Sequence, residues 1–187
     1  MKIGILGGTF NPPHIGHLIL AQDISEDLGL DKVFFIPTNI SPHKSHNEMP
    51  AEKRLEMVKL AISDNKKFEV LDLEVKRGGT SYTIDTVREL KVLYPKDEFY
   101  LIVGSDLANY FLEWKDFGEL TKLVKIVVAQ RKESPLKNKD SFIIRDITQI
   151  NISSSLIRAM IKQRRTVRYL LSDKVRDYIV KNKFYLT

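Results

Sequence analysis

The sequence of 187 residues contains no cysteine, one tryptophan and four histidines. The absence of cysteine excludes a disulfide framework and any chemistry that depends on a thiolate. The sequence also lacks an apolar run of the roughly 18 residues that a membrane-spanning helix requires. Its N-terminus enters a strand pattern without the charged, apolar and cleavage regions of a signal peptide. We therefore expect a cytoplasmic protein that has no membrane partner.

The charge is moderately positive, with 30 lysine and arginine residues against 24 acidic ones and a net charge of +6. Basic and acidic residues are interleaved along most of the chain, and residues 162–168 (KQRRTVR) form the one dense basic cluster. A basic surface can bind nucleic acid, or it can surround a site for anionic small molecules. The scattered arrangement favours the second interpretation, so we expect no nucleic-acid partner.

Short apolar segments alternate with amphipathic ones through most of the chain. With 43% hydrophobic residues, the length and composition are those of one domain with a substantial core. The alternation predicts an α/β fold, a doubly wound, Rossmann-like parallel sheet with helices on both faces. A small C-terminal helical part, about residues 153–187, is expected to belong to the same domain.

The periodicities locate the individual elements. They predict strands at 2–6, 32–36, 68–75, 98–103, 124–129 and 142–144, with 148–152 as a further candidate. They predict helices at 15–28, 51–63, 83–93, 153–161, 167–171 and 173–182, and one at 106–123 that is broken near Gly118. In doubly wound sheets ligands bind at the carboxyl ends of the strands. The unusual stretches of this sequence follow strands, so we expect them to meet at that edge.

The most informative stretch is GGTFNPPHIGH, from Gly7 to His17. It has the pattern of a strand, a glycine-rich turn and a helix start, which presents backbone N–H groups and a positive dipole end to phosphate. His14 and His17 are three residues apart, so they share one helix face and can meet the same anion. The stretch is neither a Walker loop nor a G-x-G-x-x-G fingerprint.

A second stretch, ISSSLIR, runs from Ile152 to Arg158. On its own, the serine run is an ordinary N-cap that opens a helix. Serine hydroxyls and free N–H groups at a helix start also suit phosphate oxygens. Arg158, one turn into the helix, can reach the same anion as a forked donor.

Together the two stretches resemble the signatures of the nucleotidyltransferase superfamily that joins a nucleoside monophosphate unit to a phosphorylated acceptor. In that superfamily the H-x-G-H histidines bind the phosphates of ATP and stabilise the pentavalent transition state. Its ISSTxIR segment also holds these phosphates, and Ser155 keeps a hydroxyl where threonine is usual. The resemblance implies that His14 and His17 are catalytic. It implies an ATP site formed by Gly7, Gly8, Thr9, Phe10, His14, His17, Gly104, Asp106, Ser153, Ser155 and Arg158.

Three further stretches resemble the nicotinate-nucleotide adenylyltransferase branch of this superfamily. They are GTSYT from Gly79, the lone Trp114 after Gly104-Ser105-Asp106, and SPHK from Ser41. In that branch the tryptophan stacks on the pyridine ring and the segment around Thr83 receives the nicotinate carboxylate. The resemblance implies a nicotinate mononucleotide site formed by Lys44, Ser81, Tyr82, Thr83, Asp106 and Trp114. Taken alone, GTSYT is equally a capped turn, and Trp114 is equally a core residue.

The C-terminal VRYLLSDKVRDYIVKNKFY also looks like this branch, so the resemblance covers nearly the whole chain. Two positions depart from it. Ser172 stands where proline is frequent, and Arg131-Lys132-Glu133 replaces the usual Arg-Pro-Gly. The second departure leaves the role of Arg131 open.

The implied reaction belongs to NAD biosynthesis. The phosphate of nicotinate mononucleotide attacks the α-phosphorus of ATP, pyrophosphate leaves, and deamido-NAD forms. Mg²⁺ would bridge the ATP phosphates. Because the sequence shows no dedicated carboxylate cluster, we expect phosphate oxygens and water to be its main ligands and predict no protein metal site.

Three alternatives remain open from the sequence. The acceptor could be nicotinamide mononucleotide or phosphopantetheine, or the chain could be a non-catalytic nucleotide- or RNA-binding module. The histidines at 14, 17, 43 and 46 form two H-x-x-H pairs and raise the question of zinc. Zinc-binding pairs on helices usually have i,i+4 spacing and need a third ligand, which disfavours that assignment. The sequence also leaves open whether the chain forms a homo-oligomer.

Overall fold

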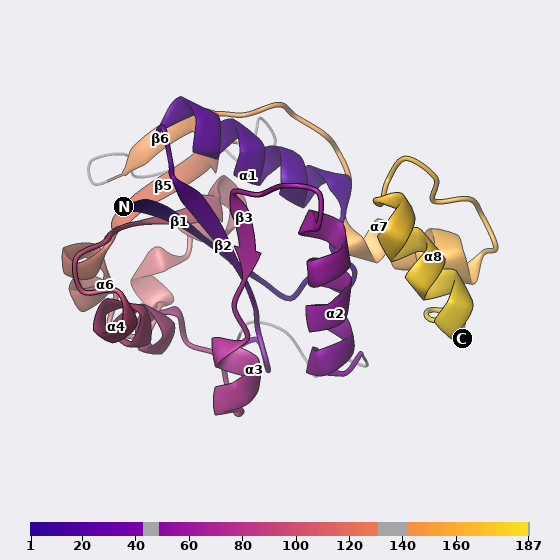
Figure 1. Ribbon diagram of the computed structural model, residues 1–187, viewed down its shortest axis with the longest axis horizontal. Coiled ribbons are helices and arrows are strands. Elements are labelled where there is room, and N and C mark those ends of the chain that lie inside the picture. The colour runs from indigo at the N-terminus through magenta and orange to yellow at the C-terminus, as the bar shows by residue number, and fades with distance from the viewer. Residues whose placement is uncertain (43–48, 131–141, 187) are drawn as a thin grey trace.

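The computed structural model describes residues 1–42, 49–130 and 142–186. Six strands form one parallel sheet in the order β3-β2-β1-β4-β5-β6 (Figure 1). Their bounds are β1 Lys2–Gly8, β2 Lys32–Pro37, β3 Phe68–Val70, β4 Glu98–Gly104, β5 Lys125–Gln130 and β6 Ile143–Asp146. This order, with β1 and β4 side by side at the centre, confirms the predicted doubly wound α/β fold.

The central strands are apolar on both faces, as parallel strands covered by helices on either side must be. In β4 the five residues from Phe99 to Val103 are all buried. Gly4 of β1 pairs with Val33 and Tyr100 on the neighbouring strands. A Cβ on Gly4 would lie 2.9 Å from Leu30 Cδ1 and 3.0 Å from Ile102 Cδ1, so a larger residue at this position would require both side chains to shift.

Helices cover both faces of the sheet. One face carries α1 (Ile15–Asp27) and α2 (Ala51–Ile62), and the other carries α4 (Thr83–Leu93) and α6 (Phe117–Leu123) (Figure 1). Phe34 and Phe35 are neighbours in β2 but pack on opposite faces, Phe34 with the α4 side and Phe35 with the α1 side. Each face therefore has its own hydrophobic core, built from alternate residues of the same strands.

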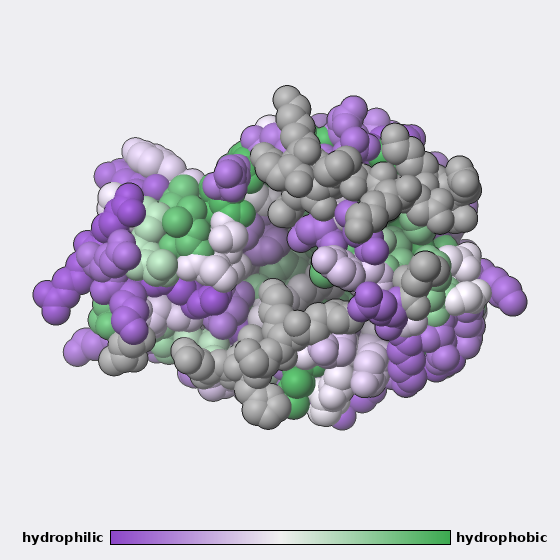
Figure 2. Space-filling view, turned by 180° about the vertical axis from the view of Figure 1, so that it is seen from behind, coloured by the Kyte–Doolittle hydropathy of each residue, from purple (hydrophilic) through white to green (hydrophobic). Residues whose placement is uncertain are grey.

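The C-terminal helices α7 (Ser154–Lys162) and α8 (Asp173–Asn182) lie beside α2 and away from the sheet (Figure 1). Met57 of α2 packs with Ile157, Val175 and Ile179 in a third hydrophobic cluster. Hydrophilic residues predominate on the outside of this helical lobe (Figure 2). None of the described helices is long and apolar enough to cross a bilayer.

Ser172, the first departure from the family pattern, has a structural role. It is the N-cap of α8, and its Oγ accepts a hydrogen bond from the backbone N–H of Val175 at 3.4 Å. A serine at this position starts the helix with a side-chain cap that proline lacks.

The prediction of a strand at 68–75 was wrong in its second half. The strand β3 ends at Val70, and Leu73–Arg77 form the short helix α3. The alternation of Leu71, Leu73 and Val75 with acidic residues imitates a strand. The chain instead turns after Leu71, so that Leu71 and Leu73 pack against the core and Glu74 is buried.

The predicted helix at 106–123 is interrupted earlier than expected. The structure has α5 (Ser105–Ala108), a 3-10 turn at Phe111–Glu113 and α6, and Gly118 lies inside α6. The ring of Phe111 lies 4.9 Å from Trp114 and 5.2 Å from Phe117. Packing of these three rings bends the chain, and Asp116 takes up the turn with a φ of 52°.

Two other predicted elements are absent from the described chain. Residues 167–171 form a turn rather than a helix, because Tyr169 has a φ of 69° and the Leu170 carbonyl accepts the Ile15 N–H at 3.0 Å. Residues 148–152 pair with no strand, and the Thr148 N–H bonds the Asp23 carboxylate at 2.7 Å. In both cases a hydrogen bond to α1 accompanies a backbone that differs from the element predicted by the local sequence pattern.

Candidate active site

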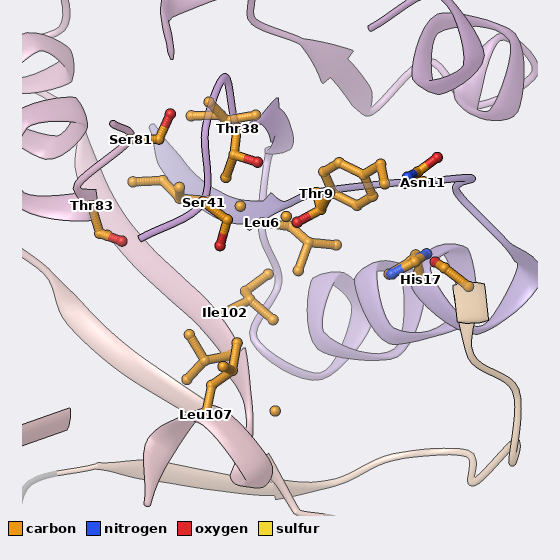
Figure 3. Close-up of a pocket in the computed structure, with 18 of the residues that line it drawn as sticks. Leu6, Thr9, Asn11, His17, Thr38, Ser41, Ser81, Thr83, Ile102 and Leu107 are labelled. Carbon is orange, nitrogen blue, oxygen red and sulfur yellow. The ribbon is translucent and has the colours of Figure 1, made fainter. Parts of the chain in front are cut away.

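A pocket of about 380 Å³ lies at the carboxyl ends of the central strands. Leu6 of β1 and Ile102 of β4 lie at its middle, where the strand order reverses (Figure 3). This is the position at which doubly wound sheets bind ligands, and the volume suits a small molecule. Asn11 and His17 lie at one end, and Ser41, Ser81 and Thr83 lie at the other (Figure 3). We call these the phosphate end and the acceptor end.

The glycine-rich turn is shaped by Phe10. This residue is buried with a φ of 49°, and its ring covers Gly8 so closely that a Cβ there would lie 3.1 Å from the ring. The same ring meets the edge of His17 at a centroid distance of 5.0 Å. Phe10 therefore both demands a glycine at position 8 and supports the second histidine from the side.

His14 and His17 stand together at the start of α1. Their rings are stacked with centroids 3.7 Å apart and an angle of 24° between the planes. The His17 Nδ1 accepts the backbone N–H of His14 at 3.1 Å, so Nε2 carries the hydrogen in the neutral ring. A Cβ on Gly16 would lie 3.1 Å from the His14 ring, which explains the glycine between the histidines. Both rings line the pocket, as predicted from their spacing.

The second predicted stretch faces the first across the phosphate end. Ser154 Oγ donates to the Pro12 carbonyl at 2.8 Å, and Arg158 Nη1 donates to the Asn11 carbonyl at 2.8 Å. Ser153 caps α7 by accepting the Leu156 N–H at 3.1 Å, which leaves its hydroxyl hydrogen to donate. The two stretches, about 140 residues apart, thus form opposite walls of one cavity with several donors and two imidazoles.

Polar groups at the start of α4 line the acceptor end. The Ser81 hydroxyl accepts the Asn39 N–H at 2.9 Å, and Thr83 is the first residue of the helix. Trp114 also lines the pocket, and its ring meets that of Phe111 edge-on. Free N–H groups of a helix start beside an aromatic ring can bind an anionic group that is attached to a flat ring.

A buried carboxyl supports this helix start. Glu74 of α3 accepts the Thr86 hydroxyl at 2.6 Å, and Arg77 donates to the same hydroxyl at 2.8 Å. Burial raises the pKa of Glu74, and the bonds from Thr86 and Ser81 and the charge of Arg77 oppose this. Glu74 therefore anchors the first turns of α4 against α3.

Arg54 joins the two ends of the pocket. Its side chain on α2 is only 1% exposed, and its guanidinium donates to the carbonyls of Met49, Thr9 and Asn39 at 3.2, 2.8 and 2.8 Å. Thr9 belongs to the phosphate end, whereas Asn39 bonds the Ser81 hydroxyl at the acceptor end. Burial lowers the pKa of Arg54, but a guanidinium remains charged in proteins. A positive charge is thereby fixed behind the loops that line the pocket.

Neither Glu74 nor Arg54 was singled out from the sequence. For Arg54 a signal exists, because it shares a helix face with Met57 and Val58 in the apolar stripe of α2. A charged residue in such a stripe is either solvated at its tip or bonded inside the protein. For Glu74 the alternating pattern predicted a strand, whereas the residue lies in the short helix α3 and is buried there.

Comparison with known proteins places this chain in a family. The profile of the family described as cytidylyltransferase-like matches residues 5–160. A probable nicotinate-nucleotide adenylyltransferase of Bacillus licheniformis is 41% identical over 187 residues, covering 100% of this chain and 99% of that protein. The nicotinate-nucleotide adenylyltransferase of Bacillus subtilis is 38% identical and covers 98% of both chains. The chain belongs to the nicotinate-nucleotide adenylyltransferase family.

Solved structures support the fold of this adenylyltransferase. A nicotinic acid mononucleotide adenylyltransferase of Plasmodium falciparum, complexed with NaAD, superposes with a TM-score of 0.82 at 22% identity and covers 98% of this chain and 97% of its own. A structure described as that of a putative nicotinate-nucleotide adenylyltransferase from Vibrio parahaemolyticus gives 0.76 at 20% identity, with 98% and 94% covered.

The structure brings most of the predicted site residues of this adenylyltransferase together. All eleven residues expected at ATP line the pocket, as do four of those expected at the acceptor: Ser81, Thr83, Asp106 and Trp114. The Tyr82 side chain is 36% exposed, does not line the pocket and lies under the Lys115 ammonium at 4.7 Å. The predictions for Lys44 and Arg131, and the histidine pair at 43 and 46, fall outside the described residues.

Proposed function

We propose that the chain transfers the adenylyl group of ATP to nicotinate mononucleotide, giving deamido-NAD and pyrophosphate. A phosphate oxygen of the mononucleotide forms a bond to the α-phosphorus. The bond from that phosphorus to the bridging oxygen of the leaving pyrophosphate breaks. The observation that carries the proposal is the juxtaposition of His14 and His17 with the α7 start in one pocket, in a chain of this family.

The phosphate end supplies charge stabilisation. His17 can donate from Nε2 to the α-phosphate, since its Nδ1 is held by the His14 backbone. Ser153, Ser155 and Arg158 can bind the β- and γ-phosphates from the opposite wall. Such transfers are catalysed mainly by positioning and by donors aimed at developing charge, with little covalent chemistry from the protein.

The acceptor end supplies selection for nicotinate mononucleotide. We assign the pyridine ring to Trp114 and the carboxylate to the α4 start at Ser81 and Thr83, with Asp106 between the two nucleotides. Donors aimed at a carboxylate favour the acid over the amide, because the amide would turn its own donors toward them. Lys44 is retained from the family resemblance as a contact to the attacking phosphate.

Mg²⁺ fits this site as a partner of the ATP phosphates. Within residues 1–42, 49–130 and 142–186, no three histidine, aspartate or glutamate side chains converge as metal ligands. Phosphate oxygens and water would therefore hold the ion; the carboxylates in the described pocket lining are Asp106 and Glu74, and Glu74 is already bonded by Thr86. Bound there, the ion would neutralise charge on the leaving pyrophosphate.

The proposal is tested by pyrophosphate release from ATP and Mg²⁺ with a panel of acceptors: nicotinate mononucleotide, nicotinamide mononucleotide and phosphopantetheine. We expect the highest kcat/KM for nicotinate mononucleotide. A higher kcat/KM for another acceptor would overturn the assignment of nicotinate mononucleotide as the acceptor, whereas the assignment of the reaction as adenylyl transfer would stand. Absence of turnover with all three, together with tight and salt-dependent RNA binding, would favour a binding module instead.

A further inference from the structure

A hydrogen bond joins Tyr185 to Asn11, which follows the glycine-rich turn. The Tyr185 hydroxyl lies 2.6 Å from Asn11 Oδ1, across 174 residues of sequence. An amide oxygen only accepts, so the phenol is the donor. Burial raises the pKa of Tyr185, with the charges of Arg158 and Arg54 opposing it, so the phenol keeps its hydrogen at neutral pH.

The backbone at Tyr185 is unusual. Its φ is 65°, in the left-handed region that bulky side chains seldom adopt. Such a conformation persists where the surroundings fix it. The Asn11 bond on the hydroxyl and the packing of Phe184 on the Tyr185 ring, at 6.3 Å, are such constraints.

Asn11 is the residue at which the two walls of the phosphate end meet. It is buried and lines the pocket between the glycine-rich turn and His14 (Figure 3). Its carbonyl accepts Arg158 Nη1, and the next carbonyl, of Pro12, accepts Ser154. Among the described residues, Tyr185 is the one that hydrogen-bonds the Asn11 side chain. A shift of Asn11 would therefore move the carbonyl that orients Arg158.

We propose that Tyr185 is a positioning residue for the nucleotide: by holding Asn11 Oδ1 it fixes the spacing between His17 and Arg158. The inference rests on the proposed function for the identity of the nucleotide as ATP. Through Tyr185, which does not line the pocket, the C-terminal helical lobe supports the phosphate end.

The test measures ATP binding by titration calorimetry without acceptor, in Tyr185→Phe and Asn11→Leu. Each variant removes one partner of the bond and keeps the size of the side chain. We expect the ATP affinity to fall about five- to tenfold, the effect of one buried hydrogen bond, with the affinity for nicotinate mononucleotide unchanged. Tyr178→Phe is the matched control on α8, since the Tyr178 ring packs on Phe184 without reaching the loop.

Two further variants separate positioning from general stability. Asn11→Gln keeps an uncharged amide oxygen as acceptor for the phenol and is expected to retain more of the ATP affinity than Asn11→Leu. The double variant Tyr185→Phe with Asn11→Leu should bind ATP as tightly as the single variant that has the lower ATP affinity, because both substitutions remove the same bond. Effects that multiply, equal losses for both ligands, or an unchanged ATP affinity in Tyr185→Phe would each overturn the inference. Failure of nicotinate mononucleotide as a substrate would overturn only the proposed acceptor, because ATP binding is measured without it.

Discussion

The two ends of the pocket are built in different ways. At the phosphate end, Ser154, Arg158 and Tyr185 bond the Asn11–Pro12 segment across 142, 147 and 174 residues of sequence. At the acceptor end, the bonds from Thr86 to Glu74 and from Arg77 to Thr86 span 12 and 9 residues, and the bond from Asn39 to Ser81 spans 42. The end assigned to the chemistry is therefore assembled across most of the chain, whereas the bonds at the end assigned to recognition span much shorter stretches of sequence.

This difference bears on what a substitution can change. The α3–α4 turn is joined to the rest of the pocket through Asn39, which bonds Ser81 and Gly79. The phosphate end shares its supports among β1, α1, α7 and the segment after α8, so a change there is felt in several elements. Arg54, which bonds the carbonyls of both Thr9 and Asn39, is the exception that couples the two ends.

The largest effect is expected from His17→Ala at the phosphate end. Loss of one donor to the developing charge should lower kcat by about 10²- to 10³-fold, with a much smaller change in ATP affinity. Pyrophosphate release and calorimetry measure the two quantities. Gln22→Ala is the control on the same helix, because Gln22 bonds Glu26 and Asn65 away from the pocket. An unchanged kcat would remove His17 from the reaction.

A smaller and more selective effect is expected from Trp114→Ala at the acceptor end. Stacking on a flat ring contributes about 1 kcal/mol, so the KM for nicotinate mononucleotide should rise about five- to tenfold. The KM for ATP should stay within about twofold, since the phosphate end is separately supported. Trp114→Phe, which keeps an aromatic face, should recover most of the loss. Equal rises in both KM values would contradict the division into two ends.

The smallest effect is expected from Glu74→Gln and appears in stability. The pKa of Glu74 is raised in the folded chain, so its contribution is fully present below the ordinary value of 4.5 and is lost as pH rises through the folded value. The free energy of unfolding of the parent chain should therefore fall relative to that of Glu74→Gln over this window. Urea unfolding at a series of pH values measures the difference. A difference independent of pH would contradict the assignment.

Most of the fold follows from the sequence pattern. The long apolar runs of β1, β2, β4 and β5 predict buried strands, and α1, α4 and α8 were placed within one residue of their observed ends. The failures at 68–75, 106–123 and 167–171 share one physical cause. In each segment a tertiary contact decides the backbone: burial of Glu74, packing around Phe111, or the bond from Ile15 to the Leu170 carbonyl.

The site divides in the same way. Residues that contact a common ligand carry recognisable spacing, so the pocket lining from Gly7 to His17 and from Ser153 to Arg158 could be predicted. Residues that act through other residues carry no such pattern. Among the described residues Arg54 donates to carbonyls, and Tyr185 donates to the Asn11 side chain with no motif of its own, because a carbonyl or amide partner can be supplied by any nearby segment.

The bond between Asn11 and Tyr185 also has a consequence for synthesis of the chain. Ribosomes add about 5–20 residues per second, so Asn11 is made roughly 9–35 s before Tyr185. For most of that interval the glycine-rich turn and its histidines exist without their opposite wall, whereas the residues assigned to the acceptor end are complete once Trp114 has been made. A chain under translation is therefore expected to acquire its recognition surface well before its capacity for transfer.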